Sequence, residues 1–106
     1  SEMCIRDRLK TVMDSLQDDQ AGMQSLVELA RMAHMSRYQL IRAFRTATGM
    51  TPHAYQLNIR INQARDWLRQ GAELADIAYR LGFADQSHFQ RIFKAHAGVT
   101  PGLYRS

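Results

Sequence analysis

The 106-residue sequence predicts an all-α fold, and three observations support that prediction. Apolar residues recur at three- and four-residue spacing along almost the whole chain, which is the period of helices that bury one face. Only two residues are proline and six are glycine, and no segment alternates apolar and polar residues as a strand does. Hydrophobic residues make up 45% of the composition, which is enough to fold one compact domain or two very small ones.

The first predicted helix is amphipathic and is followed by a break. Its apolar residues fall on one face at helical spacing: Ile5, Leu9, Val12, Met13 and Leu16. The polar run 17–24, which contains Gly22, ends this helix.

Two further helices are predicted to follow in quick succession, because two segments have the spacing of a capping box. In Ser25-Leu-Val-Glu28 and Ser36-Arg-Tyr-Gln39, both end residues can satisfy backbone N–H groups at the start of a helix. Helices joined by so short a turn must cross at a large angle. The second of them stops at Gly49, a residue suited to a left-handed C-cap. The predicted buried residues are Leu26, Leu29 and Ala30 in the first, and Leu40, Phe44 and Ala47 in the second.

A long connector helix is predicted over residues 52–70. Thr51 is its N-cap, and Pro52 occupies the first helical position, where its missing N–H costs nothing. Gly71 ends the helix, which spans about 28 Å at 1.5 Å per residue. Its apolar stripe consists of Ala54, Leu57, Ile61, Ala64 and Leu68.

The last part of the chain repeats an earlier part. A shift of 49 residues places 36–56 on 85–105, and upstream the shift is 48, so the second copy has one extra residue in its turn. We therefore predict two helix-turn-helix subdomains, 1–51 and 71–106, joined by the connector helix. Six aligned positions are identical: Arg42/Arg91, Phe44/Phe93, Gly49/Gly98, Thr51/Thr100, Pro52/Pro101 and Tyr55/Tyr104.

The second helix of each repeat is predicted to have a cationic outer face. Neither 36–48 nor 86–97 contains an acidic residue. In helix-turn-helix proteins the second helix enters the DNA major groove, where cationic, amide and hydroxyl side chains suit phosphates and base edges. A plain solvated face is the alternative, and the occurrence of two such faces in one register disfavours it. The outer positions are Tyr38, Ile41, Arg42 and Arg45 in the first copy, and Ser87, Gln90, Arg91 and Lys94 in the second.

The connector length suggests how two such helices could bind one duplex. Successive major-groove faces of B-DNA lie roughly 34 Å apart. A rigid connector of about 28 Å is close to that repeat. The two recognition helices, about 36–48 and 85–97, would then enter adjacent major grooves.

The charge distribution also indicates an anionic partner. Residues 1–35 hold four basic and six acidic residues, whereas 36–106 hold ten basic and four acidic ones. No apolar run approaches the ~18 residues of a membrane span, and we predict a cytoplasmic protein with no membrane partner. No cofactor or metal site is predicted, because Cys4 is the single cysteine and the four histidines form no H-x-x-x-H pair.

These residues resemble the DNA-binding domain of the AraC/XylS family of bacterial transcription regulators. The similarity covers about 6–105 and implies a seven-helix fold that binds double-stranded DNA to activate or repress promoters. It is most specific in the second half, in Asp76-Ile-Ala-Tyr-Arg-Leu-Gly-Phe83, Asp85-Gln-Ser-His-Phe89, Arg91-Ile-Phe93-Lys94 and Gly98-Val-Thr-Pro-Gly-Leu-Tyr-Arg105.

The resemblance also implies particular contact residues, and it contains two departures. His34 stands where the family usually has a glycine in the first turn, and histidine enters positive φ more readily than most side chains. Glu73 stands where serine or threonine often caps the fifth helix. The family's base- and backbone-contacting positions fall on Arg37, Tyr38, Ile41, Arg42 and Arg45, and on Gln86, Ser87, His88, Gln90 and Arg91.

Other functions and partners stay open from the sequence. A helical protein-interaction module, docking on RNA polymerase or on a sensor domain, would need no specific DNA readout. The family usually carries a separate sensor domain, for which 106 residues leave no space. Either the chain is an excised domain or it is a stand-alone member regulated by its abundance. An enzyme or a covalent alkyl acceptor is not predicted, because Cys4 lies alone outside the motifs.

Overall fold

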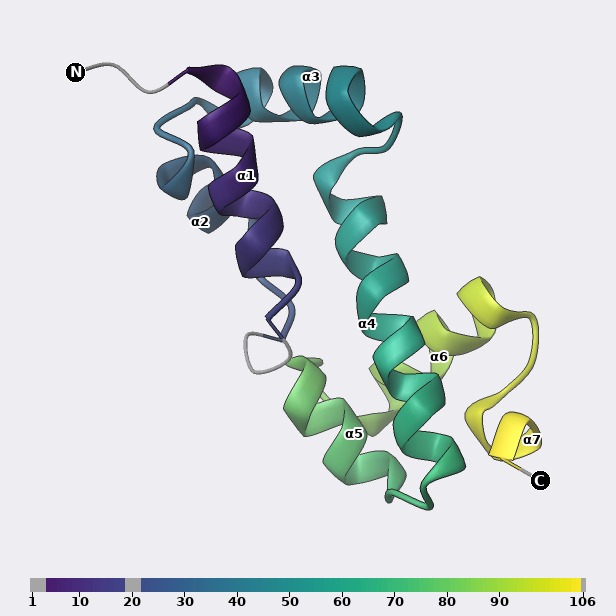
Figure 1. Ribbon diagram of the computed structural model, residues 1–106. Coiled ribbons are helices and arrows are strands. Elements are labelled where there is room, and N and C mark those ends of the chain that lie inside the picture. The colour runs from purple at the N-terminus through teal and green to yellow at the C-terminus, as the bar shows by residue number, and fades with distance from the viewer. Residues whose placement is uncertain (1–3, 19–21, 106) are drawn as a thin grey trace. The chain divides into compact units, whose positions relative to one another are not determined.

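The computed structural model describes residues 4–18 and 22–105, and within these ranges it contains seven helices and no strand (Figure 1). The all-α prediction is therefore confirmed. The chain divides into two compact units, Ser1–Leu57 (unit 1) and Asn58–Ser106 (unit 2). The helices are α1 Ile5–Leu16, α2 Leu26–Met32, α3 Arg37–Thr48, α4 Pro52–Arg69, α5 Leu74–Leu81, α6 Gln86–Ala97 and α7 Pro101–Arg105. Within the ranges described, no helix is long and apolar enough to cross a membrane.

Unit 1 has a core formed by the predicted stripes of α1, α2 and α3. Four predicted core residues of these helices are less buried than expected: Ile5 is 57% exposed, Met13 and Leu26 are half-buried, and Ala47 is exposed. Ile5 and Ala47 lie in terminal turns of their helices, where the neighbouring helices no longer cover them. The buried residues are Leu9, Val12 and Leu16 from α1, Leu29 and Ala30 from α2, and Leu40 and Phe44 from α3.

Unit 2 has a core formed by the second part of α4 together with α5, α6 and α7. The connector α4 ends at Arg69, one residue earlier than predicted, and Gly71 follows with a left-handed φ of 88°. Its 18 residues correspond to about 27 Å. The buried residues are Ile61, Ala64, Leu68, Ile77, Ala78, Leu81, Phe89 and Phe93.

The helix starts match the predicted caps to different degrees. Ser36 and Gln39 form both bonds of a capping box. Ser25 accepts a hydrogen bond from the backbone N–H of Glu28, which is one of the two predicted bonds. Glu73 makes no side-chain cap bond, in agreement with its departure from the family pattern, whereas Asp85 accepts a 2.7 Å bond from the backbone of His88.

The tight turns between α2 and α3 and between α5 and α6 each contain one residue with positive φ, although the residue types differ. His34 has φ 54° and Gly82 has φ 80°. His34 lies two positions before the N-cap Ser36, and Gly82 lies three before the N-cap Asp85. The extra residue of the second copy therefore lies in the turn, as predicted.

His34→Gly is expected to raise the free energy of unfolding by about 0.5–1 kcal/mol. The left-handed conformation destabilises the folded state by about 1–2 kcal/mol at a non-glycine residue, and glycine removes this strain. Glycine also increases the conformational entropy of the unfolded chain, which offsets part of the gain in stability. His34→Val should be less stable than the original chain, because a β-branched residue tolerates positive φ poorly. Urea unfolding followed by circular dichroism tests the order Gly, His, Val, and the reverse order would contradict it.

Five of the six repeated identities have equivalent structural roles in the two units. The rings of Phe44 and Tyr55 meet edge to face with centroids 5.2 Å apart, and those of Phe93 and Tyr104 do so at 5.8 Å. Gly49 and Gly98 are left-handed C-caps with φ of 80° and 85°.

The Thr-Pro pairs also have equivalent roles in the two units. Thr51 accepts a 3.1 Å bond from the backbone of Ala54, and Thr100 accepts one of the same length from Leu103. Pro52 and Pro101 are both buried at the first position of their helices. The repeat therefore encodes caps and packing at every identical pair except that of the two arginines.

Thr51→Ala is expected to lower the free energy of unfolding by about 1 kcal/mol, because it removes the N-cap bond of α4. Thr51→Ser keeps a hydroxyl at the same position and should leave the stability close to that of the original chain. Urea unfolding of both variants measures the difference. An alanine variant as stable as the serine variant would show that this cap is unimportant.

Candidate nucleic-acid interface

Helix α3 carries the predicted recognition residues of unit 1, and most of them are exposed. Arg37, Tyr38, Arg42 and Arg45 are exposed, and Tyr38 is 68% accessible although it is a large aromatic residue. Ile41 is half-buried, because its position on the helix turns partly towards the core. The exposed surface of α3 therefore carries all three of the arginines predicted there.

Tyr38 and Arg42 contact each other on this face. The Arg42 guanidinium carbon lies 5.5 Å from the centroid of the Tyr38 ring, within the range of a cation–π interaction. The sequence predicted both residues on this face but not their contact, although side chains four residues apart on a helix are neighbours.

Helix α6 carries the corresponding residues of unit 2. The exposed ones are Gln86, Ser87, Arg91 and Lys94, whereas His88 and Gln90 are half-buried. The His88 ring meets Phe83 edge to face with centroids 5.3 Å apart, and its Nδ1 is buried with no hydrogen-bond partner in the described part of the chain. Packing therefore holds His88 partly away from the outer face.

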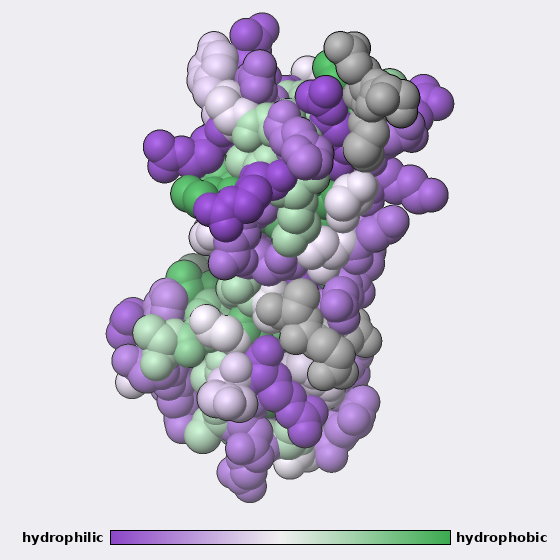
Figure 2. All heavy atoms as spheres, turned by 90° about the vertical axis from the view of Figure 1, so that its left-hand side faces the viewer, coloured by the Kyte–Doolittle hydropathy of each residue, from purple (hydrophilic) through white to green (hydrophobic). Residues whose placement is uncertain are grey.

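The cations of both faces form no ion pair with another residue of the described ranges. Within residues 4–18 and 22–105, the one ion pair joins Arg69 and Asp66 on α4. Arg42 and Arg91 share a repeat position and are both exposed. Figure 2 shows hydrophilic residues over much of one face, with hydrophobic residues between them in small patches. Uncompensated cations of this kind suit a phosphate backbone.

The described residues present two groups of polar and cationic side chains on helices α3 and α6. Among the described residues, no group of three or more His, Cys, Asp or Glu side chains could hold a metal ion. The structure brings the predicted residues together as two groups, one on α3 in unit 1 and one on α6 in unit 2. Each group stands on the second helix after a tight left-handed turn. This combination defines a helix-turn-helix protein that contains the motif twice.

Comparison with known families agrees with this class. A family model described as a helix-turn-helix domain matches residues 29–106. The chain belongs to this family, and it is a DNA-binding domain of the AraC/XylS type. The relatives of this chain are transcription regulators by name.

The similar proteins include sequences and solved structures. The chain is 40% identical over 82 residues to the uncharacterized HTH-type transcriptional regulator YbfI of Bacillus subtilis, a match that covers 77% of this chain and 30% of YbfI. An AraC-type transcriptional regulator from Chromobacterium violaceum is 28% identical with a TM-score of 0.78, covering 94% of this chain and 90% of that one. The DNA-binding domain of AdpA, solved in complex with a target DNA, is 25% identical with a TM-score of 0.77, covering 95% and 88%.

Proposed function

We propose that this chain is the DNA-binding part of a bacterial transcription regulator and that α3 and α6 are its two recognition helices. One observation carries the assignment. Of the six repeated identities, five serve caps and packing, and the sixth is the exposed pair Arg42 and Arg91. The Tyr38 contact of Arg42 has no counterpart at Arg91, because the equivalent residue of the second copy is Ser87. A residue pair that repeats without a shared internal role is best explained by a repeated external one. Arginine reads guanine edges through two parallel hydrogen bonds and also binds phosphate.

The contact surface that we propose has a central and a flanking part. Arg42 and Arg91 would contact base edges, while Arg45 and Lys94, one turn further along, would contact phosphates. The predicted residues Arg37, Tyr38, Ile41, Gln86, Ser87, His88 and Gln90 complete the surface. The half-buried Ile41, His88 and Gln90 would contribute by apolar contact or by positioning their neighbours.

The helix α4 supports a two-site mode of binding. We propose that 1–51 and 71–106 act as two helix-turn-helix subdomains, with α4 as the connector between them. Its length of about 27 Å is compatible with recognition helices in successive major grooves. One chain would then recognise two sub-sites about one helical turn apart.

The partners beyond DNA are also proposals. The chain spans about a third of the length of the curated relatives it matches. We propose that a sensor domain elsewhere in the same regulator, or RNA polymerase, acts on this domain in the cytoplasm. A module that binds such a protein without reading DNA is the alternative.

Selection of bound sites from a random duplex pool tests the proposal. We expect an enriched motif with two sub-sites about 10 base pairs apart, and binding that weakens steeply as salt rises. A single box would show that only one unit reads bases. No enriched motif, together with weak and salt-insensitive DNA binding, would contradict DNA readout and favour the protein-interaction module.

A further inference from the structure

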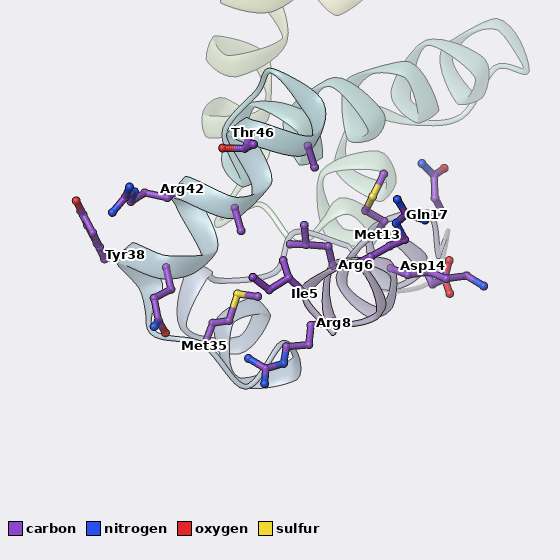
Figure 3. A pocket seen from close by; sticks show the side chains of 15 residues that line it. Ile5, Arg6, Arg8, Met13, Asp14, Gln17, Met35, Tyr38, Arg42 and Thr46 are labelled. Atoms are coloured by element: carbon purple, nitrogen blue, oxygen red, sulfur yellow. The ribbon is translucent and has the colours of Figure 1, made fainter. Parts of the chain in front are cut away.

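A groove runs between α1 and α3, entirely within unit 1 (Figure 3). Its volume is about 910 Å³. The apolar side chains that line it are spaced four residues apart, at Ile5, Leu9 and Met13 on α1 and at Ala43 and Ala47 on α3. Each helix thus contributes a stripe, and the stripes give the groove an elongated apolar floor.

Part of this floor is accessible to a partner. Ile5 and Ala47 are exposed, and Met13, Met35 and Ala43 are half-buried. The two methionines are unbranched and adaptable, a property of surfaces that accept amphipathic helices. Both walls are helices of 12 residues, or about 18 Å in length. The groove therefore has the length and the lining of a helix-binding site.

The rim of the groove carries four cations and one carboxylate. Arg6, Arg8, Lys10 and Arg42 line it together with Asp14, and none of the five forms an ion pair in the described part of the chain. Arg6 and Arg8 lie at the start of α1, where the helix dipole disfavours positive charge. The two arginines therefore do not stabilise α1 through its dipole, whereas an anionic partner would explain their presence at this position.

We propose that this groove docks an acidic amphipathic helix of a protein partner. Its apolar residues would cover the floor, and its carboxylates would pair with Arg6, Arg8 and Lys10. The phosphates of a DNA backbone could pair with the cations of the rim, but DNA has no apolar face to bury against Ile5 and Met13. The combination of floor and rim favours a protein helix over nucleic acid at this position.

The docking site shares residues with the proposed recognition face. Tyr38 and Arg42 line the groove and project from α3 beside it (Figure 3). A helix seated in the groove would cover Arg42 and compete with DNA for it. This competition rests on the proposed DNA-binding function, whereas the docking itself does not.

Selection from a phage-displayed library of peptides, each about 15 residues or four helical turns long, tests the docking with the 106-residue chain as bait. We expect enriched peptides with apolar residues at i, i+3 or i+4, and i+7, flanked by Asp and Glu. Ala47→Glu inserts a carboxylate into the groove and should weaken their binding by about tenfold or more. Ala75→Glu, at an exposed alanine of α5, is the matched control and should leave their binding unchanged.

Three results would overturn the docking proposal: no enriched peptide, enriched peptides without acidic residues, or equal binding to the Ala47→Glu variant. Circular dichroism of both variants confirms that they are folded. Displacement of a selected duplex by the peptide then tests the competition. Simultaneous binding of peptide and duplex would refute the competition and leave the docking intact. Failure to bind any duplex would refute the proposed function, and the competition with it, but not the docking.

Discussion

Phe93→Ala is expected to lower the free energy of unfolding of unit 2 by about 3–5 kcal/mol. Phe93 is fully buried, and its ring lies 5.8 Å from those of both Phe89 and Tyr104, measured between centroids. Its removal leaves a cavity between α6 and α7 that neighbouring aromatic rings cannot fill. A unit of about 50 residues has a small free energy of unfolding. Unit 2 of the variant should therefore be largely unfolded near room temperature.

The single tryptophan offers a local probe for this experiment. Trp67 lies on α4 within unit 2, where the Arg80 guanidinium carbon is 5.3 Å from its ring centroid. Urea unfolding followed by its fluorescence therefore reports on unit 2. Tyr79→Ala is the matched control, because this aromatic residue is 86% exposed and should change the stability by less than about 0.5 kcal/mol. A Phe93→Ala variant as stable as this control would contradict the description of the core.

Arg42→Ala and Arg91→Ala are each expected to weaken binding to a selected duplex by about 1–3 kcal/mol. Both guanidinium groups are exposed and without an ion pair in the described part of the chain, so their removal should leave the fold intact. Arg65→Ala on α4, whose side chain bonds Asn62, is the matched control and should have a smaller effect. Fluorescence anisotropy with a labelled duplex measures the three affinities. Unchanged affinity in both test variants would refute the assignment of recognition helices.

The variant Arg42→Lys separates base reading from phosphate binding. Lysine keeps the charge but cannot form the planar, bidentate contact of a guanidinium group. If Arg42 reads a base, the lysine variant should lose discrimination at one position of the site. If Arg42 binds only phosphate, discrimination should survive and the salt slope should stay the same.

The helices and their caps could be predicted from the sequence because they depend on neighbours within one turn. The left-handed positions of Gly49 and Gly98, and the bonds of Thr51 and Thr100, follow from the residue types at those positions. The 49-residue repeat then indicated that both copies would fold in the same way.

The departure at His34 was predictable for the same local reason. Its position in the repeat corresponds to Gly82, and both residues have positive φ. One reciprocal bond of the Ser25 and Glu28 pair was predicted and is not formed, because the spacing of a capping box permits the second bond but does not enforce it. Local patterns therefore gave the positions of the helices more accurately than the details of their ends.

By itself, the sequence determined the helices, the tight turns and the two cationic faces, since each depends on residues three or four apart. Only the tertiary structure decided how much of each side chain is covered, because burial depends on residues distant in the chain. In the folded chain Ile41, His88 and Gln90 are half-buried, and Ala47 is exposed beside a groove. The tertiary structure also buried Gln56, whose amide bonds the backbone of Gln24, a contact that no sequence period predicts.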